Sequence, residues 1–140
     1  MATVNKIFVY GTLMNGFLKD VFPGTDLSIK SSKPGTIRAR LYDLGEYPGA
    51  RPTKMAAKQL SGEVHEIEQG RVEQVLKILD EYEGFDAKDR KGSLYLREIT
   101  AVTTARGNVL KTWVYWYNRS CKGLTEIKEG DYNKYLKRNK

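Results

Sequence analysis

The stretch from residue 93 to residue 117, SLYLREITAVTTARGNVLKTWVYWY, decides the class of fold. It contains two runs rich in β-branched and aromatic residues, Ser93–Ala105 and Val109–Tyr117, and such runs are typical of strands. Only Arg106-Gly107-Asn108 separates them, and a short connection that contains glycine predicts an antiparallel hairpin. We therefore expect a sheet in which this hairpin is the most regular part.

The clearest helix comes just before the hairpin and runs from Arg71 to about Glu83. Gly84 follows it and is well suited to a left-handed cap that ends a helix. The apolar residues recur at offsets of 0, 3, 4 and 7, so they lie on one face. These residues are Val72, Val75, Leu76 and Leu79.

The remaining segments are shorter. Residues 6–13, KIFVYGTL, predict a buried strand that runs into a tight turn, and residues 36–44 and 60–67 are further strand candidates. Residues 15–35 and 45–52 are rich in glycine and proline and predict irregular loops, and a short helix is expected near residues 131–136. This order lacks the regular alternation of a doubly wound sheet. We expect an α+β fold with a mixed, curled sheet and few helices.

Length and composition indicate a single cytoplasmic domain. The 140 residues match the commonest domain size, and we assign residues 1–130 to the domain and residues 131–140 to a basic helix or tail. No run of apolar residues is long enough to span a membrane, and the N-terminus has no apolar signal core. Cys121 is the only cysteine, so neither an internal disulfide nor a cysteine zinc cluster is expected.

The net charge of +7 raises the hypothesis that the protein binds nucleic acid. The charge is uneven, because the last ten residues hold four basic residues and one acidic residue, which leaves +4 for the first 130. Tails of this kind usually solvate the chain end, so we do not favour a nucleic-acid partner. The alternative would combine the basic tail with the aromatic face of the hairpin, where Trp113 and Tyr115 alternate, although such faces more often fill a core.

Glu83 is the most informative single residue. On a helical wheel it lies about 20° from Val72 and Leu76, so it continues the apolar stripe. A carboxylate that faces a core costs several kcal/mol unless it is paired or protonated, and the neighbouring Tyr82 and Phe85 should raise its pKa by desolvation. Such a group in a cleft suits general acid–base catalysis. Alternatively, the helix ends before Glu83 and the side chain reaches water.

Other functional signals are weak or absent. The turn after the first strand could aim successive backbone N–H groups into an anion-binding concavity, but it lacks the spacing and the lysine of a phosphate loop. His65 is the only histidine and lies within a strand candidate, where a structural or surface role is expected. No dinucleotide fingerprint follows a strand.

Taken together, these segments resemble the gamma-glutamyl cyclotransferase-like family, including its small bacterial-type and gamma-glutamylamine cyclotransferase-like members. The order and spacing of the matching segments agree across nearly the whole chain. The segments are VYGTL (Val9–Leu13), YPGA (Tyr47–Ala50), LDEYEGF (Leu79–Phe85), YLRE (Tyr95–Glu98), WVYWYN (Trp113–Asn118) and EGDY (Glu129–Tyr132).

The resemblance implies a small mixed β-barrel with flanking helices and one essential glutamate beside a cavity. Carried over by position, the catalytic glutamate is Glu83. The substrate-binding turn falls on Tyr10, Gly11, Thr12 and Leu13, and Tyr95, Arg97 and Tyr115 match further positions of the substrate site. The implied reaction releases 5-oxoproline from a small γ-glutamyl substrate and needs neither a metal nor a cofactor.

Two rival functions stay open at this level. The first is a barrel of the same fold that binds a small ligand without turnover. The second is nucleic-acid binding through the basic tail and the aromatic face of the hairpin. The identity of the leaving group is open as well. We expect a monomer, because no apolar stripe is left over once the core is assigned.

Overall fold

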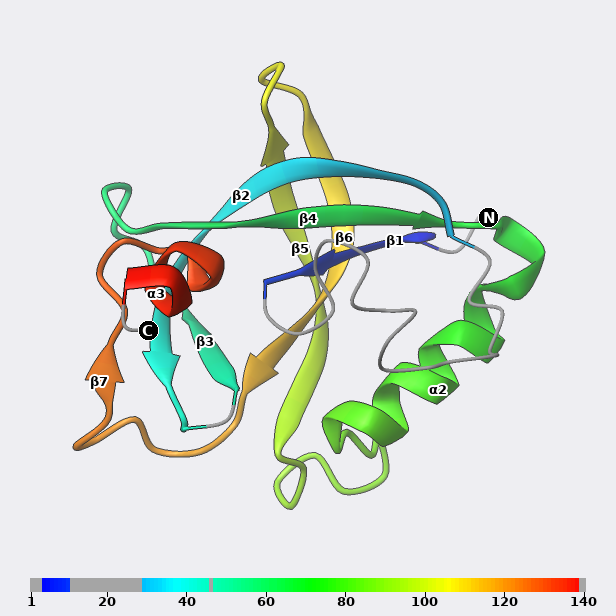
Figure 1. Cartoon of the computed structure of the whole chain (residues 1–140). Helices are drawn as coiled ribbons and strands as arrows, with labels where there is room; N and C mark the ends of the chain where they lie inside the picture. Colours follow the sequence, from blue (N-terminus) through cyan, green and yellow to red (C-terminus); the bar gives the residue numbers. More distant parts are fainter. Residues whose placement is uncertain (1–3, 11–28, 46, 139–140) are drawn as a thin grey trace.

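The computed structural model describes residues 4–10, 29–45 and 47–138. Within these ranges, seven strands and three helical segments follow one another (Figure 1). The strands are β1 (Lys6–Val9), β2 (Ile29–Asp43), β3 (Pro48–Pro52), β4 (Gln59–Ile67), β5 (Tyr95–Thr104), β6 (Val109–Tyr117) and β7 (Thr125–Glu126). The helical segments are the 3-10 turn η1 (Gln69–Arg71) and the α-helices α2 (Val72–Glu83) and α3 (Tyr132–Arg138).

Five of the strands close into a barrel. They are hydrogen-bonded in the order β2–β4–β1–β6–β5, and β5 pairs back to β2, where Gly35 lies opposite Thr104. The pair β1–β6 is parallel and the other barrel pairs are antiparallel. This confirms the expected α+β fold with a small mixed barrel. The short strands β3 and β7 extend the sheet at one end of β2.

Glycine permits the closure of the barrel. A Cβ atom at Gly35 would lie 2.7 Å from Cγ1 of Val102, closer than real Cβ contacts come. Because Gly35 has no side chain, β2 can approach β5 at this position and their backbones can pair.

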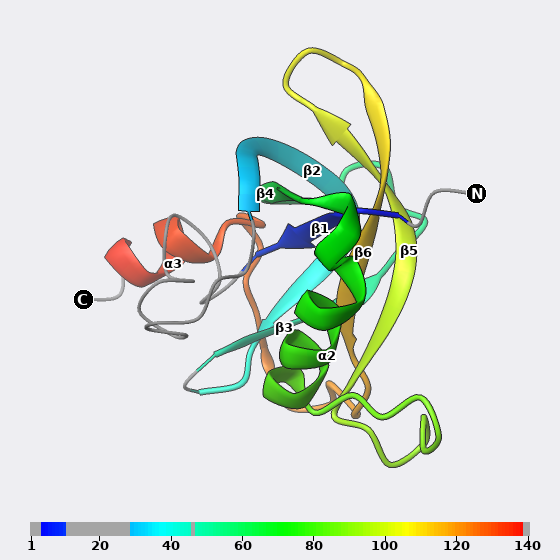
Figure 2. The ribbon, with the colours of Figure 1, turned by 90° about the vertical axis from the view of Figure 1, so that its right-hand side faces the viewer.

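The helix α2 lies against the barrel (Figure 2). Its apolar stripe is buried, as the sequence periodicity predicts. Val72, Val75, Leu76 and Leu79 are all buried. The helix ends at Glu83, and Gly84 follows with a φ of +76°, the left-handed conformation that favours glycine. The predicted helix, its cap and the β5–β6 hairpin are thus confirmed.

Two loop predictions are wrong over part of their length, and residues 15–28 of the first lie outside the described residues. Residues 29–35 form the first half of β2 and pair with β4, from Ile29 opposite Ile67 to Gly35 opposite Gly62. Residues 48–52 form β3 and pair with the second half of β2. Both segments are polar or rich in glycine and proline, and they are strands because an adjacent strand supplies their hydrogen bonds. Pro48 and Pro52 stand at the first and last positions of β3, where a missing N–H is best tolerated.

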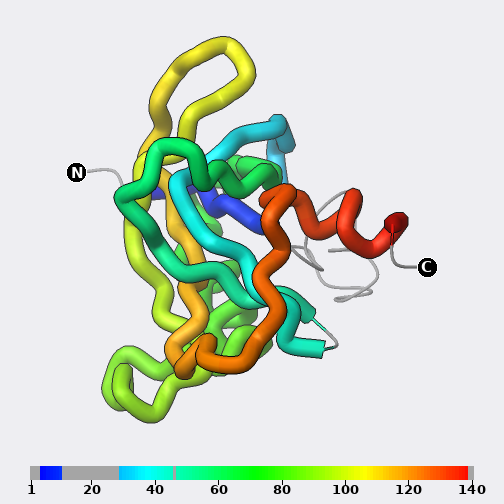
Figure 3. The backbone as a smooth tube through the Cα atoms, turned by 90° about the vertical axis from the view of Figure 1, so that its left-hand side faces the viewer, coloured from blue at the N-terminus to red at the C-terminus, as the bar shows by residue number. Residues whose placement is uncertain are grey.

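The C-terminal segment returns to the barrel end that carries β3. In Figure 3 the stretch before α3 runs alongside β2, and β7 pairs there with Tyr42 and Asp43. In α3, Tyr132 is buried and the Tyr135 hydroxyl donates a 2.7 Å hydrogen bond to Oδ2 of Asp43. The predicted short helix is therefore present and is tied to the sheet.

His65, the only histidine, is buried within β4 and hydrogen-bonded through Nδ1 to the Ser32 hydroxyl on β2. This location agrees with the structural role that the sequence suggests.

Gly62 offers a test of how closely β1 and β4 are packed. A Cβ atom there would lie 2.3 Å from the backbone oxygen of Val9, which cannot move away as a flexible side chain could. Gly62→Ala should lower the free energy of unfolding by about 1–3 kcal/mol in a urea titration. The control is Gly70→Ala, because an added Cβ there meets nothing within 4 Å. Equal stabilities for the two variants would contradict this account of the packing.

Candidate active site

A cavity of about 220 Å³ lies where the end of α2 meets β1, β5 and β6. Its described lining is apolar and aromatic apart from one carboxylate. The lining residues are Phe8, Val9, Tyr10, Tyr47, Pro48, Tyr82, Glu83, Leu94, Tyr95 and Tyr115.

Glu83 supplies the only carboxylate of this lining. It is the last residue of α2, and the burial of Leu76 and Leu79 on the same face of the helix turns it towards the barrel. Burial raises the pKa of the Glu83 carboxyl to about 7. Among the residues that the structure describes, none donates a hydrogen bond to this carboxyl group. It can therefore gain or lose a proton near neutral pH.

Two of the tyrosines in the cavity wall have their hydroxyl groups tied to the backbone. The Tyr10 hydroxyl donates to the carbonyl oxygen of Tyr115 at 2.6 Å and accepts from the N–H of Ala50 at 3.3 Å. The Tyr95 hydroxyl donates to the carbonyl oxygen of Pro48 at 2.8 Å. Burial, with the nearby charge of Glu83, raises the pKa of both side chains, so both stay neutral. They form a fixed, uncharged wall.

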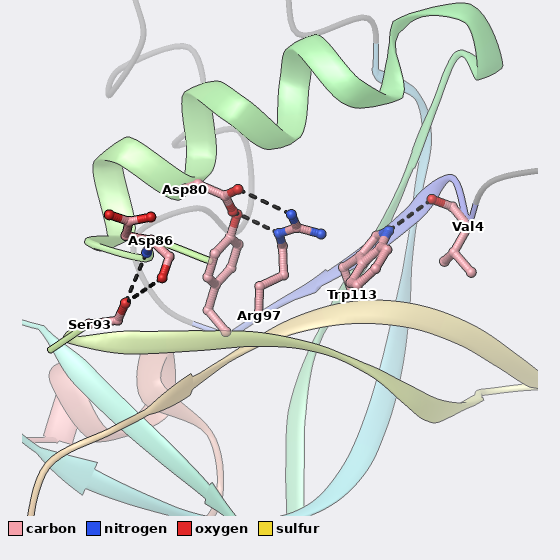
Figure 4. Close-up of polar contacts among 7 residues, drawn as sticks. Val4, Asp80, Asp86, Ser93, Arg97 and Trp113 are labelled. Carbon is pink, nitrogen blue, oxygen red and sulfur yellow. Dashed lines mark hydrogen bonds and ion pairs between the residues drawn. The ribbon is translucent and has the colours of Figure 1, made fainter. Parts of the chain in front are cut away.

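Tyr115 and Arg97 meet at a third residue, Asp80. The ring of Tyr115 lines the cavity, while its hydroxyl donates to Oδ1 of Asp80 at 2.6 Å. Arg97 binds both oxygens of the same carboxylate (Figure 4). It lies outside the cavity lining, in a neighbouring groove along α2.

The structure thus brings four of the predicted site residues together around one cavity: Glu83, Tyr10, Tyr95 and Tyr115. It places Arg97 one contact away, behind Asp80. Gly11, Thr12 and Leu13 lie outside the described residues. The binding roles assigned to all of these residues stay predictions.

Sequence reasoning gave no role to Asp80 or to the cavity residues Tyr47 and Leu94. Asp80 carried one usable signal, because it precedes Glu83 by three residues and such residues are neighbours on a helix surface. Tyr47 lies within YPGA, a segment that matches the family pattern but gives no role to this tyrosine.

Within the described ranges, no group of three or more His, Cys, Asp or Glu side chains is placed to hold a metal ion. No helix in this part of the chain is long and apolar enough to cross a membrane.

Comparison with known proteins agrees with the sequence resemblance. Residues 7–134 match the protein family described as Gamma-glutamyl cyclotransferase, AIG2-like. The chain belongs to this family. The match runs from β1 into α3, so it includes every strand of the barrel and the helix that carries Glu83.

Individual relatives also match this chain over nearly its whole length. The Gamma-glutamylcyclotransferase family protein ytfP of Citrobacter rodentium is 31% identical, over 91% of this chain and 94% of the relative. The solution structure of ytfP from Escherichia coli is 29% identical, covers 96% of this chain and 99% of its own, and has a TM-score of 0.57. An AIG2-like protein of Mus musculus shares the fold, with a TM-score of 0.64 at 23% identity, over 89% of this chain and 86% of its own.

The raised pKa of Glu83 predicts that the difference in unfolding free energy between the wild type and Glu83→Gln depends on pH. The folded protein holds this proton more tightly than the unfolded chain, so the stabilisation is complete below about pH 4.5 and is lost as the pH rises through about 7. From pH 5 to pH 8, the unfolding free energy of the wild type should fall by at most about 3 kcal/mol relative to Glu83→Gln.

Urea unfolding at the two pH values measures this difference. Glu81→Gln is the matched control, because Glu81 is an exposed glutamate of the same helix. A constant difference between wild type and Glu83→Gln across this range would show that the Glu83 pKa is not raised.

Proposed function

We propose that this protein is a gamma-glutamyl cyclotransferase that releases 5-oxoproline from a small γ-glutamyl compound, with Glu83 as the general acid and base. The observation that carries the proposal is the position of Glu83, a carboxyl group with a pKa of about 7 in the wall of an aromatic cavity. Membership of the family supports it.

The chemistry asks little of the protein, because the substrate carries its own nucleophile. The α-amino nitrogen of the γ-glutamyl group attacks the γ-carbonyl carbon and closes a five-membered ring. The bond from that carbon to the leaving nitrogen then breaks. Intramolecular closure of this kind has a high effective molarity, so holding the substrate in a folded conformation removes much of the barrier.

Two proton transfers accompany these bond changes. A base removes a proton from the attacking amine, and an acid delivers a proton to the departing nitrogen. Glu83 can perform both in turn, because with a pKa of about 7 both of its forms are populated at neutral pH. No cofactor enters this scheme, since nucleophile and electrophile belong to one molecule.

The cavity walls suit the remaining parts of the substrate. The faces of Tyr10, Tyr95 and Tyr115 offer apolar contacts to the methylene groups of the glutamyl chain. We assign the α-carboxylate or the developing oxyanion to the backbone N–H groups of Gly11, Thr12 and Leu13, which follow Tyr10 in the chain. We further propose that the protein acts in the cytoplasm as a monomer.

Glu83→Gln tests the catalytic assignment. The variant keeps the shape of the side chain and loses the titratable group, so 5-oxoproline release should fall at least about 100-fold. Wild type and variant are compared on a panel of γ-glutamyl amines and γ-glutamyl dipeptides, with 5-oxoproline read by mass spectrometry. Glu81→Gln should keep the wild-type rate.

Three other outcomes would contradict parts of the proposed function. Full activity of Glu83→Gln would remove Glu83 from the mechanism. Free glutamate in place of 5-oxoproline would identify a hydrolase. Binding without turnover by the wild type would favour a non-catalytic ligand-binding barrel.

The pH profile gives a separate prediction. The base form of Glu83 starts the reaction, so kcat/KM should fall with decreasing pH below about 7, by about tenfold per pH unit. Steady-state rates between pH 5 and pH 9 measure this limb. A rate that stays constant down to pH 5 would contradict a base with this pKa.

A further inference from the structure

Asp80 is a partly buried carboxylate one helical turn before Glu83, and the proposed chemistry gives it no role. Three hydrogen bonds converge on its side chain. Arg97 donates from Nε to Oδ1 at 2.7 Å and from Nη2 to Oδ2 at 3.1 Å, and the Tyr115 hydroxyl donates to Oδ1 at 2.6 Å. The carboxylate of Asp80 therefore links α2 to both β5 and β6.

Arg97 is itself held in place by aromatic rings. Its guanidinium carbon lies 4.4 Å from the ring centre of Trp113 and 5.5 Å from that of Phe85. The indole N–H of Trp113 donates in turn to the carbonyl oxygen of Val4 at 2.9 Å (Figure 4). A stacked and bidentate arginine has little freedom to move, so it gives Asp80 a rigid partner.

The backbone of Asp80 holds the residues that follow Glu83. Its carbonyl oxygen accepts the N–H of Gly84 at the helix cap and the N–H of Phe85 at 2.9 Å. Glu83 therefore sits in a turn that Asp80 closes through its backbone and anchors through its side chain.

The network also reaches the cavity wall. Tyr115, which donates to Asp80 through its hydroxyl, accepts the Tyr10 hydroxyl on its backbone oxygen at 2.6 Å. Both tyrosine rings line the cavity with Glu83. One set of contacts thus fixes both the Glu83 turn and the part of the cavity wall that Tyr10 and Tyr115 form.

We propose that Asp80 is the positioning residue of this site, and that with Arg97 and Tyr115 it holds the Glu83 turn at a fixed place against the cavity wall. The inference rests on the proposed function, because it assigns to Asp80 the placement of the proposed acid–base group.

The charges predict the sign of one measurable effect. Asp80 and Arg97 carry opposite charges and neutralise each other. An uncharged residue at position 80 leaves the positive charge of Arg97 without a carboxylate partner. It also weakens the contacts that hold the Glu83 turn, so water can reach the Glu83 carboxyl. Both changes favour the ionised form of Glu83, so the Glu83 pKa falls.

Other titratable groups also lie near this network, and of these Tyr115 interacts with Asp80 directly, because the Asp80 carboxylate accepts the Tyr115 hydroxyl and contributes to its raised pKa. Those of the cavity lining are Tyr10, Tyr47, Tyr82, Tyr95 and Tyr115. Those of the groove that holds Asp80 and Arg97 are Glu73, Lys77, Glu81 and Asp86.

Asp80→Asn is the deciding variant, because the amide keeps the shape of the side chain and loses its charge and one acceptor. We expect kcat on the substrate found by the γ-glutamyl panel to fall by about tenfold or more, with little change in KM, since displacing a catalytic group lowers the rate more than it weakens binding. Carbon-13 NMR of the ligand-free protein should show the Glu83 pKa about one unit or more below that of the wild type.

Glu98→Gln is the matched control. Glu98 lies on β5 and forms an exposed ion pair at 3.2 Å with Arg90 of the preceding loop, so this variant also replaces a paired carboxylate by an amide, but away from the cavity. It should leave kcat and the Glu83 pKa at their wild-type values.

Tyr115→Phe covers the case in which Asp80→Asn does not fold. It removes only the hydroxyl that donates to Asp80 and keeps the ring and the backbone oxygen that Tyr10 uses. It should lower kcat and the Glu83 pKa in the same direction by smaller amounts. A folded Asp80→Asn with unchanged kcat and unchanged Glu83 pKa, or the same result for Tyr115→Phe, overturns the proposal.

The two proposals can fail separately. If the wild type releases no 5-oxoproline, the proposed function fails. The NMR titration still decides whether Asp80 positions Glu83, because it needs no substrate.

Discussion

The helix α2 can bury its apolar stripe against the barrel in only one rotation about its axis, and that rotation carries Glu83 into the cavity. Four aliphatic side chains on this stripe stabilise the packed helix by about 6–12 kcal/mol. Holding the Glu83 carboxyl away from water costs at most about 3 kcal/mol at pH 8. Packing therefore outweighs desolvation, and the fold maintains a carboxyl group whose proton is available at neutral pH.

The remaining parts of the site surround this helix end with groups that cannot shift. Hydroxyl groups of Tyr10 and Tyr95 are tied to backbone oxygens, which keeps the rings in place and the cavity wall uncharged. Asp80 joins the same helix to the hairpin through Arg97 and Tyr115. A site with one titrating group needs this rigidity, because a displacement of about 1 Å can lower a rate by about 100-fold.

Sequence reasoning succeeded where a feature depends on neighbours in the chain. The stripe of α2, the cap at Gly84 and the hairpin turn are local, since each involves residues within a few positions of one another. It failed for residues 29–35 and 48–52, whose compositions resemble loops. These segments are strands because other strands supply their hydrogen-bond partners, and composition carries little information about such long-range pairing.

The sequence by itself determined that Glu83 falls on the apolar face of any helix that includes it, because helical periodicity relates it to Val72 and Leu76. The structure decided that the helix extends to Glu83. Only the tertiary structure decided what the other site residues touch. The contacts of Asp80 with Arg97 and Tyr115 span 17 and 35 residues, and the contact of Tyr10 with Tyr115 spans 105. Closure of the barrel brings these partners together, and that closure depends on strand pairing and on the close approach that Gly35 allows, neither of which periodicity reveals.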